Sequence, residues 1–130
     1  MSEESQSYKI LIVDDDPKIL RVLGKILESR DYNVITTDKT DLALKELEQS
    51  EVAVIVSDLE MPEMSGIKLL EQAKEISPKT IRIMLTGHPH TVSKDDASEV
   101  LAVHRFLLKP VSVEDFLDVI EANTQLYLMG

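Results

Sequence analysis

Acidic, hydroxyl-bearing and basic side chains stand at the ends of four short apolar runs of this sequence. They are Asp14, Asp15 and Asp16 after KILIV, Asp58 after VAVIVS, Thr86 at the end of IRIMLT and Lys109 after RFLL. If these runs form one parallel sheet, the side chains meet at its carboxyl edge, where such sheets bind ligands. Clustered carboxylates repel one another, and a hard cation such as Mg²⁺ relieves that repulsion through oxygen ligands. A carboxylate nucleophile, a metal, a lysine and a hydroxyl donor are the parts that phosphoryl transfer requires.

Each of these pieces taken alone has an ordinary structural explanation. The run of three aspartates can be a solvated helix cap, and Asp58 can be a turn residue. Thr86 can be a plain strand end, and Lys109 a plain exposed lysine. The chemical interpretation therefore depends on finding suitable residues at four independent strand ends.

The apolar pattern predicts five strands that alternate with five helices. The strands are residues 9–13, 33–37, 52–57, 81–86 and 105–108. Helical spacing follows Asp16, Thr40, Ser65 and Ser112, each of which can cap its helix, and a weaker helix is predicted at 91–102. This alternation favours a doubly wound α/β domain, with a parallel sheet covered by helices on both faces.

The composition is that of one compact, acidic domain. The chain has 130 residues, 43% of them hydrophobic, and a formal net charge of −10, which disfavours direct binding to nucleic acid. It has no cysteine, and no apolar run approaches the roughly 20 residues that a membrane span needs. The first residues are polar and acidic, unlike a signal peptide. We expect a cytoplasmic protein with a flexible segment at 1–8, a folded domain at 9–127 and a tail at 128–130.

Four segments together resemble the signature of bacterial response-regulator receiver domains of the CheY-like type. They are ILIVDDDP at 10–17, SDLEMPEMSG at 57–66, MLTGH at 84–88 and FLLKP at 106–110. Each piece is modest, but their order and spacing are specific, and the resemblance covers the chain from about residue 9 to 126. It implies a flavodoxin-like fold, with five parallel strands in the order 2-1-3-4-5, and a two-component signalling switch.

The resemblance also assigns roles at the phosphorylation site. Asp58 matches the phosphoacceptor, Asp15 the direct metal ligand, and Asp14 its acidic neighbour, which often acts through metal-bound water. Glu60 matches the position whose main-chain carbonyl completes a site for Mg²⁺ or Mn²⁺.

Three further residues match the parts of the family that respond to phosphorylation. Thr86 matches the hydroxyl residue that follows the phosphoryl group on activation, and Lys109 matches the salt-bridging lysine. Phe106 matches the aromatic residue whose rotamer reports the switch. In this family the bond between Lys109 and Pro110 is commonly cis.

The sequence departs from the family pattern at several positions. Ser65 stands where the family often has Asp, and it can still cap the next helix. Phe106 lacks the hydroxyl of the common Tyr, so its switching cannot use that hydrogen bond. Glu60 and His88 match two variable positions beside the phosphorylation site, and we expect them to tune the lifetime of the phosphoryl group. His104, just before the last strand, is expected to be partly buried.

The implied phosphodonor is a sensor histidine kinase or a phosphotransfer protein, and the implied recipient of the signal is an output domain or a partner protein. A homodimer through the fourth helix, the fifth strand and the last helix is a further option. The segments RIMLTGH and HRFLLKPVS also resemble receivers attached to HD-type phosphohydrolase domains. A stand-alone regulator and the receiver part of a longer protein would look alike in this sequence.

Two other functions fit parts of the pattern. A phosphatase of the haloacid dehalogenase type also uses an Asp nucleophile in an Asp-x-Asp opening, but Pro17 stands where Gly-Thr would follow. Turnover of a generic phosphate ester would identify such an enzyme. A docking module that is never phosphorylated would tolerate the loss of Asp58 or Lys109, and both are present. We therefore expect a signalling switch that assists its own phosphorylation and dephosphorylation, without an independent metabolic substrate.

Overall fold

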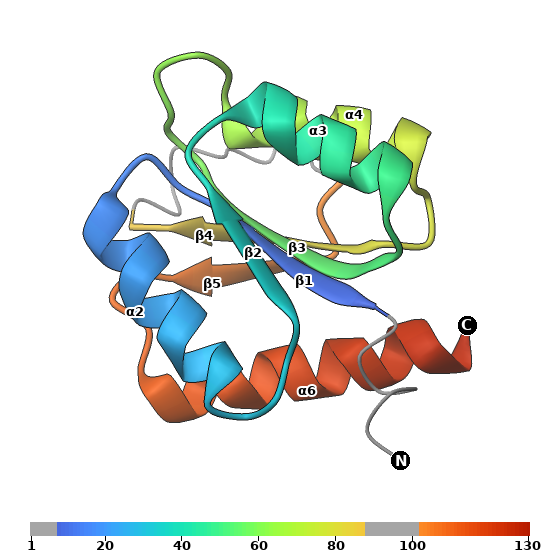
Figure 1. Ribbon diagram of the computed structural model, residues 1–130. Helices are drawn as coiled ribbons and strands as arrows, with labels where there is room; N and C mark the ends of the chain where they lie inside the picture. The colour runs from blue at the N-terminus through green and yellow to red at the C-terminus, as the bar shows by residue number, and fades with distance from the viewer. Residues whose placement is uncertain (1–7, 88–101) are drawn as a thin grey trace.

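The computed structural model describes residues 8–87 and 102–130, and its centre is a sheet of five parallel strands (Figure 1). The strands are β1 (Lys9–Val13), β2 (Val34–Thr37), β3 (Val52–Asp58), β4 (Ile81–Thr86) and β5 (Arg105–Leu108). Their order, β2-β1-β3-β4-β5, is the predicted one. Because the order reverses between β1 and β3, the chain leaves these two strands in different directions and opens a site at their carboxyl ends.

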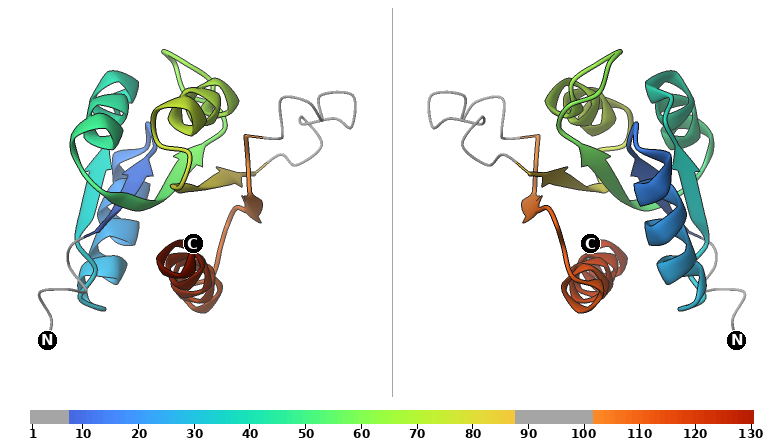
Figure 2. Two further views of the ribbon diagram at one scale, coloured as in Figure 1. Left: turned by 90° about the vertical axis from the view of Figure 1, so that its right-hand side faces the viewer. Right: turned by 90° about the vertical axis from the view of Figure 1, so that its left-hand side faces the viewer.

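Helices cover both faces of the sheet (Figures 1 and 2). Those in the described residues are α2 (Pro17–Glu28), α3 (Thr40–Gln49), α4 (Gly66–Ile76) and α6 (Val113–Met129). Helices α2 and α6 lie on one face, and α3 and α4 lie on the other. The helix predicted at 91–102 falls, apart from Ala102, outside the described residues. No helix in the described part of the chain is both long and apolar enough to cross a membrane.

The alternation of side chains along the strands builds a core on each face. On β1, Ile10 and Ile12 join the core under α2 and α6, whereas Leu11 and Val13 join the core under α3 and α4. All seven residues of β3 are buried, as expected for a central strand covered on both faces. Burial of this strand fixes the position of Asp58 at its end.

Three of the four predicted helix caps are present. The side chain of Asp16 accepts a hydrogen bond from the Lys18 backbone N–H, and Ser65 and Ser112 make the equivalent bond at α4 and α6. The prediction for Thr40 is wrong, because Lys39 occupies the cap position and makes no side-chain cap bond. Thr40 is the first helical residue instead, and its hydroxyl lies 3.5 Å from a Glu63 carboxylate oxygen.

Two tyrosines pack together near the amino-terminal end of the sheet. Tyr8 is buried, and its ring centroid lies 6.4 Å from that of Tyr127 on α6. The Tyr127 hydroxyl donates to a Glu51 carboxylate oxygen at 2.8 Å, and burial together with this bond raises the pKa of Tyr127 to about 12. The packed structure thus includes Tyr8, and α6 continues to Met129, slightly beyond both boundaries expected from the sequence.

Candidate functional site

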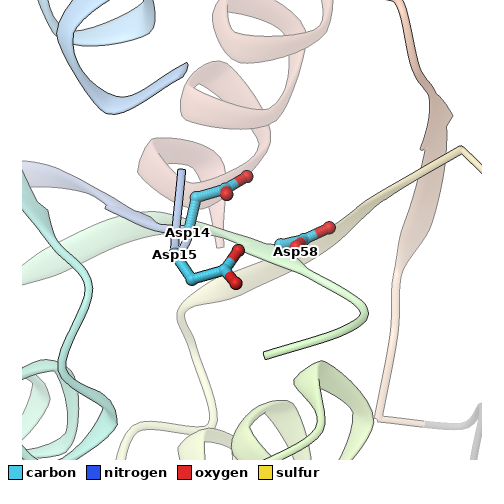
Figure 3. Close-up of side chains that lie close together, drawn as sticks. All are labelled: Asp14, Asp15 and Asp58. Atoms are coloured by element: carbon cyan, nitrogen blue, oxygen red, sulfur yellow. The ribbon is translucent and has the colours of Figure 1, made fainter. Parts of the chain in front are cut away.

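Three carboxylates meet at the carboxyl ends of β1 and β3. Asp14 and Asp15 follow β1, and Asp58 is the last residue of β3, which pairs with β1 up to Val13 and Ser57. One oxygen from each carboxylate lies within 4.8 Å of the others, and Figure 3 shows the three side chains side by side. Asp14 is 1% exposed and Asp58 8%, whereas Asp15 is open to solvent. The predicted cluster is therefore formed, with two buried members and one accessible member.

Lys109 supplies the positive charge of this cluster. Its Nζ lies 3.0 Å from Asp58 Oδ1 and 3.4 Å from Asp14 Oδ2. The backbone N–H of Lys109 donates to the Thr86 carbonyl at 2.8 Å, and the Lys109–Pro110 bond is cis. Burial alone would lower the pKa of Lys109, but the hydrogen bond to Asp58 and the charge of Asp14 outweigh it, so this pKa is raised. The lysine is therefore charged, but one cation does not neutralise three carboxylates.

Asp14 carries an unsatisfied buried oxygen. Its Oδ1 accepts a hydrogen bond from the Asp16 backbone N–H at 2.8 Å, whereas Oδ2 has no hydrogen-bond partner in the described residues and faces Lys109 only at ion-pair distance. Burial raises the pKa of Asp14, and the charge of Asp58 adds to this, against the opposing effects of the Asp16 N–H and Lys109. A buried orphan oxygen beside two further carboxylates fits a hard divalent cation with oxygen ligands, such as Mg²⁺ or Mn²⁺.

The carboxylate of Asp58 is held by the backbone around it. Its Oδ1 accepts from the Leu59 backbone N–H at 3.0 Å, and its own carbonyl accepts from the Ser57 hydroxyl at 2.9 Å. Gly66 approaches the same carbonyl so closely that a Cβ at Gly66 would lie 2.1 Å from the Asp58 oxygen. The sequence reasoning missed this contact, although the glycine directly after the Ser65 cap was a visible signal.

A cleft of about 370 Å³ opens above these groups. Its lining residues are Asp15, Asp58, Leu59, Glu60, Thr86, Gly87 and Lys109. Thr86 is buried in this lining, whereas Glu60 is exposed. Asp14 is not part of the lining. The cleft is large enough to admit a phosphoryl group beside Asp58.

Other residues singled out from the sequence lie elsewhere. Phe106 is 39% exposed on β5 and does not line the cleft. His88 lies outside the described residues. His104 is exposed as a whole residue, but its Nδ1 makes a partly buried hydrogen bond with the Arg82 backbone N–H on β4, which agrees with the expected partial burial.

Fold and site together define a class: a doubly wound α/β domain with an acidic, lysine-anchored cleft at the carboxyl edge of its sheet. Such an arrangement offers a carboxylate nucleophile, a cation and a hydroxyl in one cleft, which suits reaction with a phosphoryl group.

Comparison with known proteins identifies the family. The family model described as the response regulator receiver domain matches residues 10–121. The transcriptional regulatory protein GlrR of Escherichia coli (strain K12) is 34% identical over 112 residues, which are 86% of this chain and 25% of GlrR. This chain belongs to the response regulator receiver family, and it spans about a quarter or less of the length of the curated relatives that it matches.

Solved structures agree with this assignment. A CheY-like response regulator receiver domain protein from Methanospirillum hungatei JF-1 is 30% identical, with a TM-score of 0.84 over 94% of this chain and 97% of that chain. The beryllofluoride-activated NtrC4 receiver domain dimer is 35% identical, with a TM-score of 0.80 over 92% of this chain and 98% of that chain. The predicted fold, family and signalling class are thus confirmed.

Proposed function

We propose that Asp58 is the phosphoacceptor of this receiver. A carboxylate oxygen of Asp58 forms a bond to phosphorus while the bond from phosphorus to the donor breaks. The leaving atom is the nitrogen of a phosphohistidine or an oxygen of acetyl phosphate, and it keeps the electron pair. The observation that carries the proposal is the contact of Lys109 with both Asp58 and Asp14, since a mobile cation at this point can follow the new charge onto the phosphoryl oxygens.

The metal belongs on the open side of the same cluster. Asp14, Asp15 and Asp58 would hold Mg²⁺ or Mn²⁺, together with the main-chain carbonyl of Glu60. The bound ion would supply charge neutralisation for the incoming phosphoryl oxygens. Asp15→Ala should lose most of the Mg²⁺ affinity measured by titration, and Asp14→Ala should lose less. Undiminished affinity in Asp15→Ala would contradict this ligand set.

The signal leaves the site through β4 and β5. Thr86 at the end of β4 lines the cleft, and we infer that its hydroxyl moves to the phosphoryl group once Asp58 is modified. Phe106 on β5 pairs in register with Met84 on β4, so a shift at the end of β4 can change its exposure. Such a response is a shift between two packings of different stability, driven by contacts that only one of them makes.

The phosphodonor docks beside Lys109, in a groove between α2 and the loop after β5. The groove has a volume of about 470 Å³ and is lined by Lys18, Ile19, Val22, Leu23, Leu85, Lys109, Pro110 and Val111. Helix α2, which borders this groove, also exposes Arg21 and Lys25, in a chain with a net charge of −10. This combination suits a histidine kinase or phosphotransfer protein that presents apolar and acidic side chains together.

If the phosphodonor docks in this groove, a change in the groove should affect transfer from a histidine kinase but not reaction with acetyl phosphate. Val22→Glu places a charge at the groove, and it should slow transfer from a histidine kinase while leaving reaction with acetyl phosphate unchanged. Leu42→Glu is the matched control, because Leu42 is similarly exposed but lies on α3, on the other face of the sheet. Equal transfer to the Val22 and Leu42 variants would remove the groove from the proposal.

The surface proposed to transmit the signal is the one expected from the sequence. It comprises the helix predicted at 91–102, together with β5 and α6. A homodimer through this surface, or a partner or output domain bound to it, would carry the signal onward in the cytoplasm. The similarity to the NtrC4 receiver domain dimer supports the homodimer option. Glu60 at the cleft and His88 are proposed to tune the lifetime of the phosphoryl group.

Phosphorylation in solution tests the proposed role of Asp58. Incubation of the chain with acetyl phosphate and Mg²⁺ should add one phosphoryl group by intact-mass spectrometry. Asp58→Asn should abolish the addition, whereas Asp41→Asn, at an exposed aspartate on α3, should not. A full, acid-stable phosphoryl group on Asp58→Asn would contradict the assignment.

A further inference from the structure

A buried arginine ties β4 to the chain that enters β5. Arg82 on β4 is 4% exposed, and its guanidinium pairs with no carboxylate in the described residues. It donates instead to backbone carbonyls, from Nε to Ala102 at 2.5 Å and from Nη1 to Thr80 at 3.1 Å and Pro78 at 3.3 Å. Burying a charge is costly unless its donors are satisfied, so these carbonyls make the position of Arg82 tolerable.

His104 extends the hydrogen bonding between β4 and β5 by one residue. Its backbone N–H donates to the Arg82 carbonyl at 2.8 Å, and its Nδ1 accepts from the Arg82 backbone N–H at 2.9 Å. The regular ladder between the strands starts one residue later, with Ile83 opposite Arg105. Both backbone polar groups of Arg82 are therefore satisfied by His104, one of them through the imidazole.

The bond to Nδ1 fixes the protonation state of the imidazole. A ring nitrogen that accepts a hydrogen bond carries no proton, so the neutral ring must bear its hydrogen on Nε2. That Nε2 lies 3.5 Å from Nη2 of Arg82, where both atoms are donors. The closed arrangement thus accepts only the neutral Nε2–H tautomer of His104.

A proton on Nδ1 would break the arrangement in two ways. It would remove the acceptor of the Arg82 N–H, and it would place a positive charge beside a buried guanidinium. The charges that the described residues bring to His104 are Arg82 from β4 and Lys74 from α4, both cationic. Partial burial against β4, followed by these two charges, lowers the pKa of His104.

The contact between Arg82 and His104 lies at the start of the strand that leads to Lys109. Strand β5 is the last strand of the sheet and has four residues, three of which expose their side chains. Among the described strands it pairs with β4 alone. Its carboxyl end leads directly to Lys109. We propose that Arg82 and His104 form a proton-sensitive clasp, whose opening on acidification loosens β5 at the edge that carries Lys109.

The clasp does not depend on phosphorylation of Asp58, so it is tested in the unmodified chain. Long-range ¹H–¹⁵N NMR should find His104 as the Nε2–H tautomer at pH 7.5. Amide hydrogen exchange at Arg82 and along β5 should then show more opening at pH 5.5 than at pH 7.5, after correction for the intrinsic rate. The increase should reach up to about tenfold, because an opened His104 with an ordinary pKa of about 6.5 favours the open state by that factor over this pH range.

Two controls make the result specific. His104→Asn keeps an acceptor close to the position of Nδ1 but does not titrate, so its exchange at Arg82 should lose the pH response. The amide of Ile55 on the central strand β3 reports any general loss of stability at low pH. An Nδ1–H tautomer at pH 7.5, or an equal pH response in wild type and His104→Asn, would overturn the proposal. If His104→Asn does not fold, the tautomer and the comparison of Arg82 with Ile55 in the wild type decide it.

Discussion

Replacing Asp14 by Asn should stabilise the metal-free domain, although Asp14 belongs to the functional site. The side chain is almost fully buried, and its Oδ2 has no hydrogen-bond partner in the described residues. Asn keeps an oxygen for the Asp16 N–H and removes one of three clustered negative charges. The free energy of unfolding should therefore rise because a buried charge is removed, not because a new contact forms.

The magnitude follows from two opposing effects. Burial of a charged carboxylate that is incompletely hydrogen-bonded costs at least roughly 1–3 kcal/mol, and Asn at position 14 removes the charge, although its amide nitrogen then lacks an acceptor. Against this, Lys109 loses its 3.4 Å ion pair with Asp14 but keeps the 3.0 Å contact with Asp58. A partly exposed ion pair is worth up to about 1 kcal/mol. The free energy of unfolding should thus rise by about 1 to 2 kcal/mol at pH 7.5.

The pH dependence has a defined sign. The pKa of Asp14 is raised in the folded state, so the folded protein binds a proton more readily than the unfolded chain does. Stability from this group is present below the ordinary pKa of about 3.9 and is lost as the pH rises through the folded pKa. The difference between Asp14→Asn and wild type should therefore shrink toward zero as the pH falls to about 4.

Urea denaturation in EDTA, followed by circular dichroism, measures this difference. Asp15→Asn is the matched control, since Asp15 is exposed and its substitution should change the stability by less than about 0.5 kcal/mol. Saturating Mg²⁺ should narrow the gap between wild type and Asp14→Asn, because the ion stabilises only a folded site that binds it. A destabilised Asp14→Asn at pH 7.5, or a gap that does not depend on pH, would refute the reasoning about burial.

Three further predictions concern other parts of the site. Gly66→Ala should cost about 1–3 kcal/mol in urea denaturation, because its Cβ would meet the Asp58 carbonyl at 2.1 Å, whereas Gly24→Ala on α2 should cost far less. Glu60→Asn should speed loss of the phosphoryl group about tenfold, or about 1.4 kcal/mol of barrier, by admitting water to the cleft. Decay rates equal to wild type after donor removal would exclude Glu60 from this role. A phosphoryl mimic should shift the amide signals of Thr86 and Phe106, and unchanged signals would contradict their coupling.

The fold could be predicted from the sequence because its elements carry strong local signals. The continuous apolar run of β3 indicated a central strand, and the residues after each strand were expected at one edge. The meeting of Asp14, Asp58 and Lys109 at this edge was predicted from that placement, and the structure adds that Lys109 contacts both carboxylates.

The features that escaped prediction depend on packing between distant segments. The sequence did not distinguish the buried Asp14 from the exposed Asp15, because both follow the same strand. It also gave no sign that His104 would bond to Arg82, since Arg82 lies on β4 and His104 directly precedes β5. Thr40 was expected to be a cap from its residue type, but the helix begins one residue earlier than that role requires.

Chemical mapping of the phosphorylated residue tests the central claim most directly. Acetyl phosphate and Mg²⁺ should convert Asp58 to an acyl phosphate, which borohydride reduces to homoserine. Peptide mass spectrometry should then find homoserine at position 58 in the treated wild type and none in a sample prepared without acetyl phosphate. Homoserine at Asp14 or Asp15 instead, or a phosphoryl group that resists borohydride, would contradict Asp58 as the phosphoacceptor.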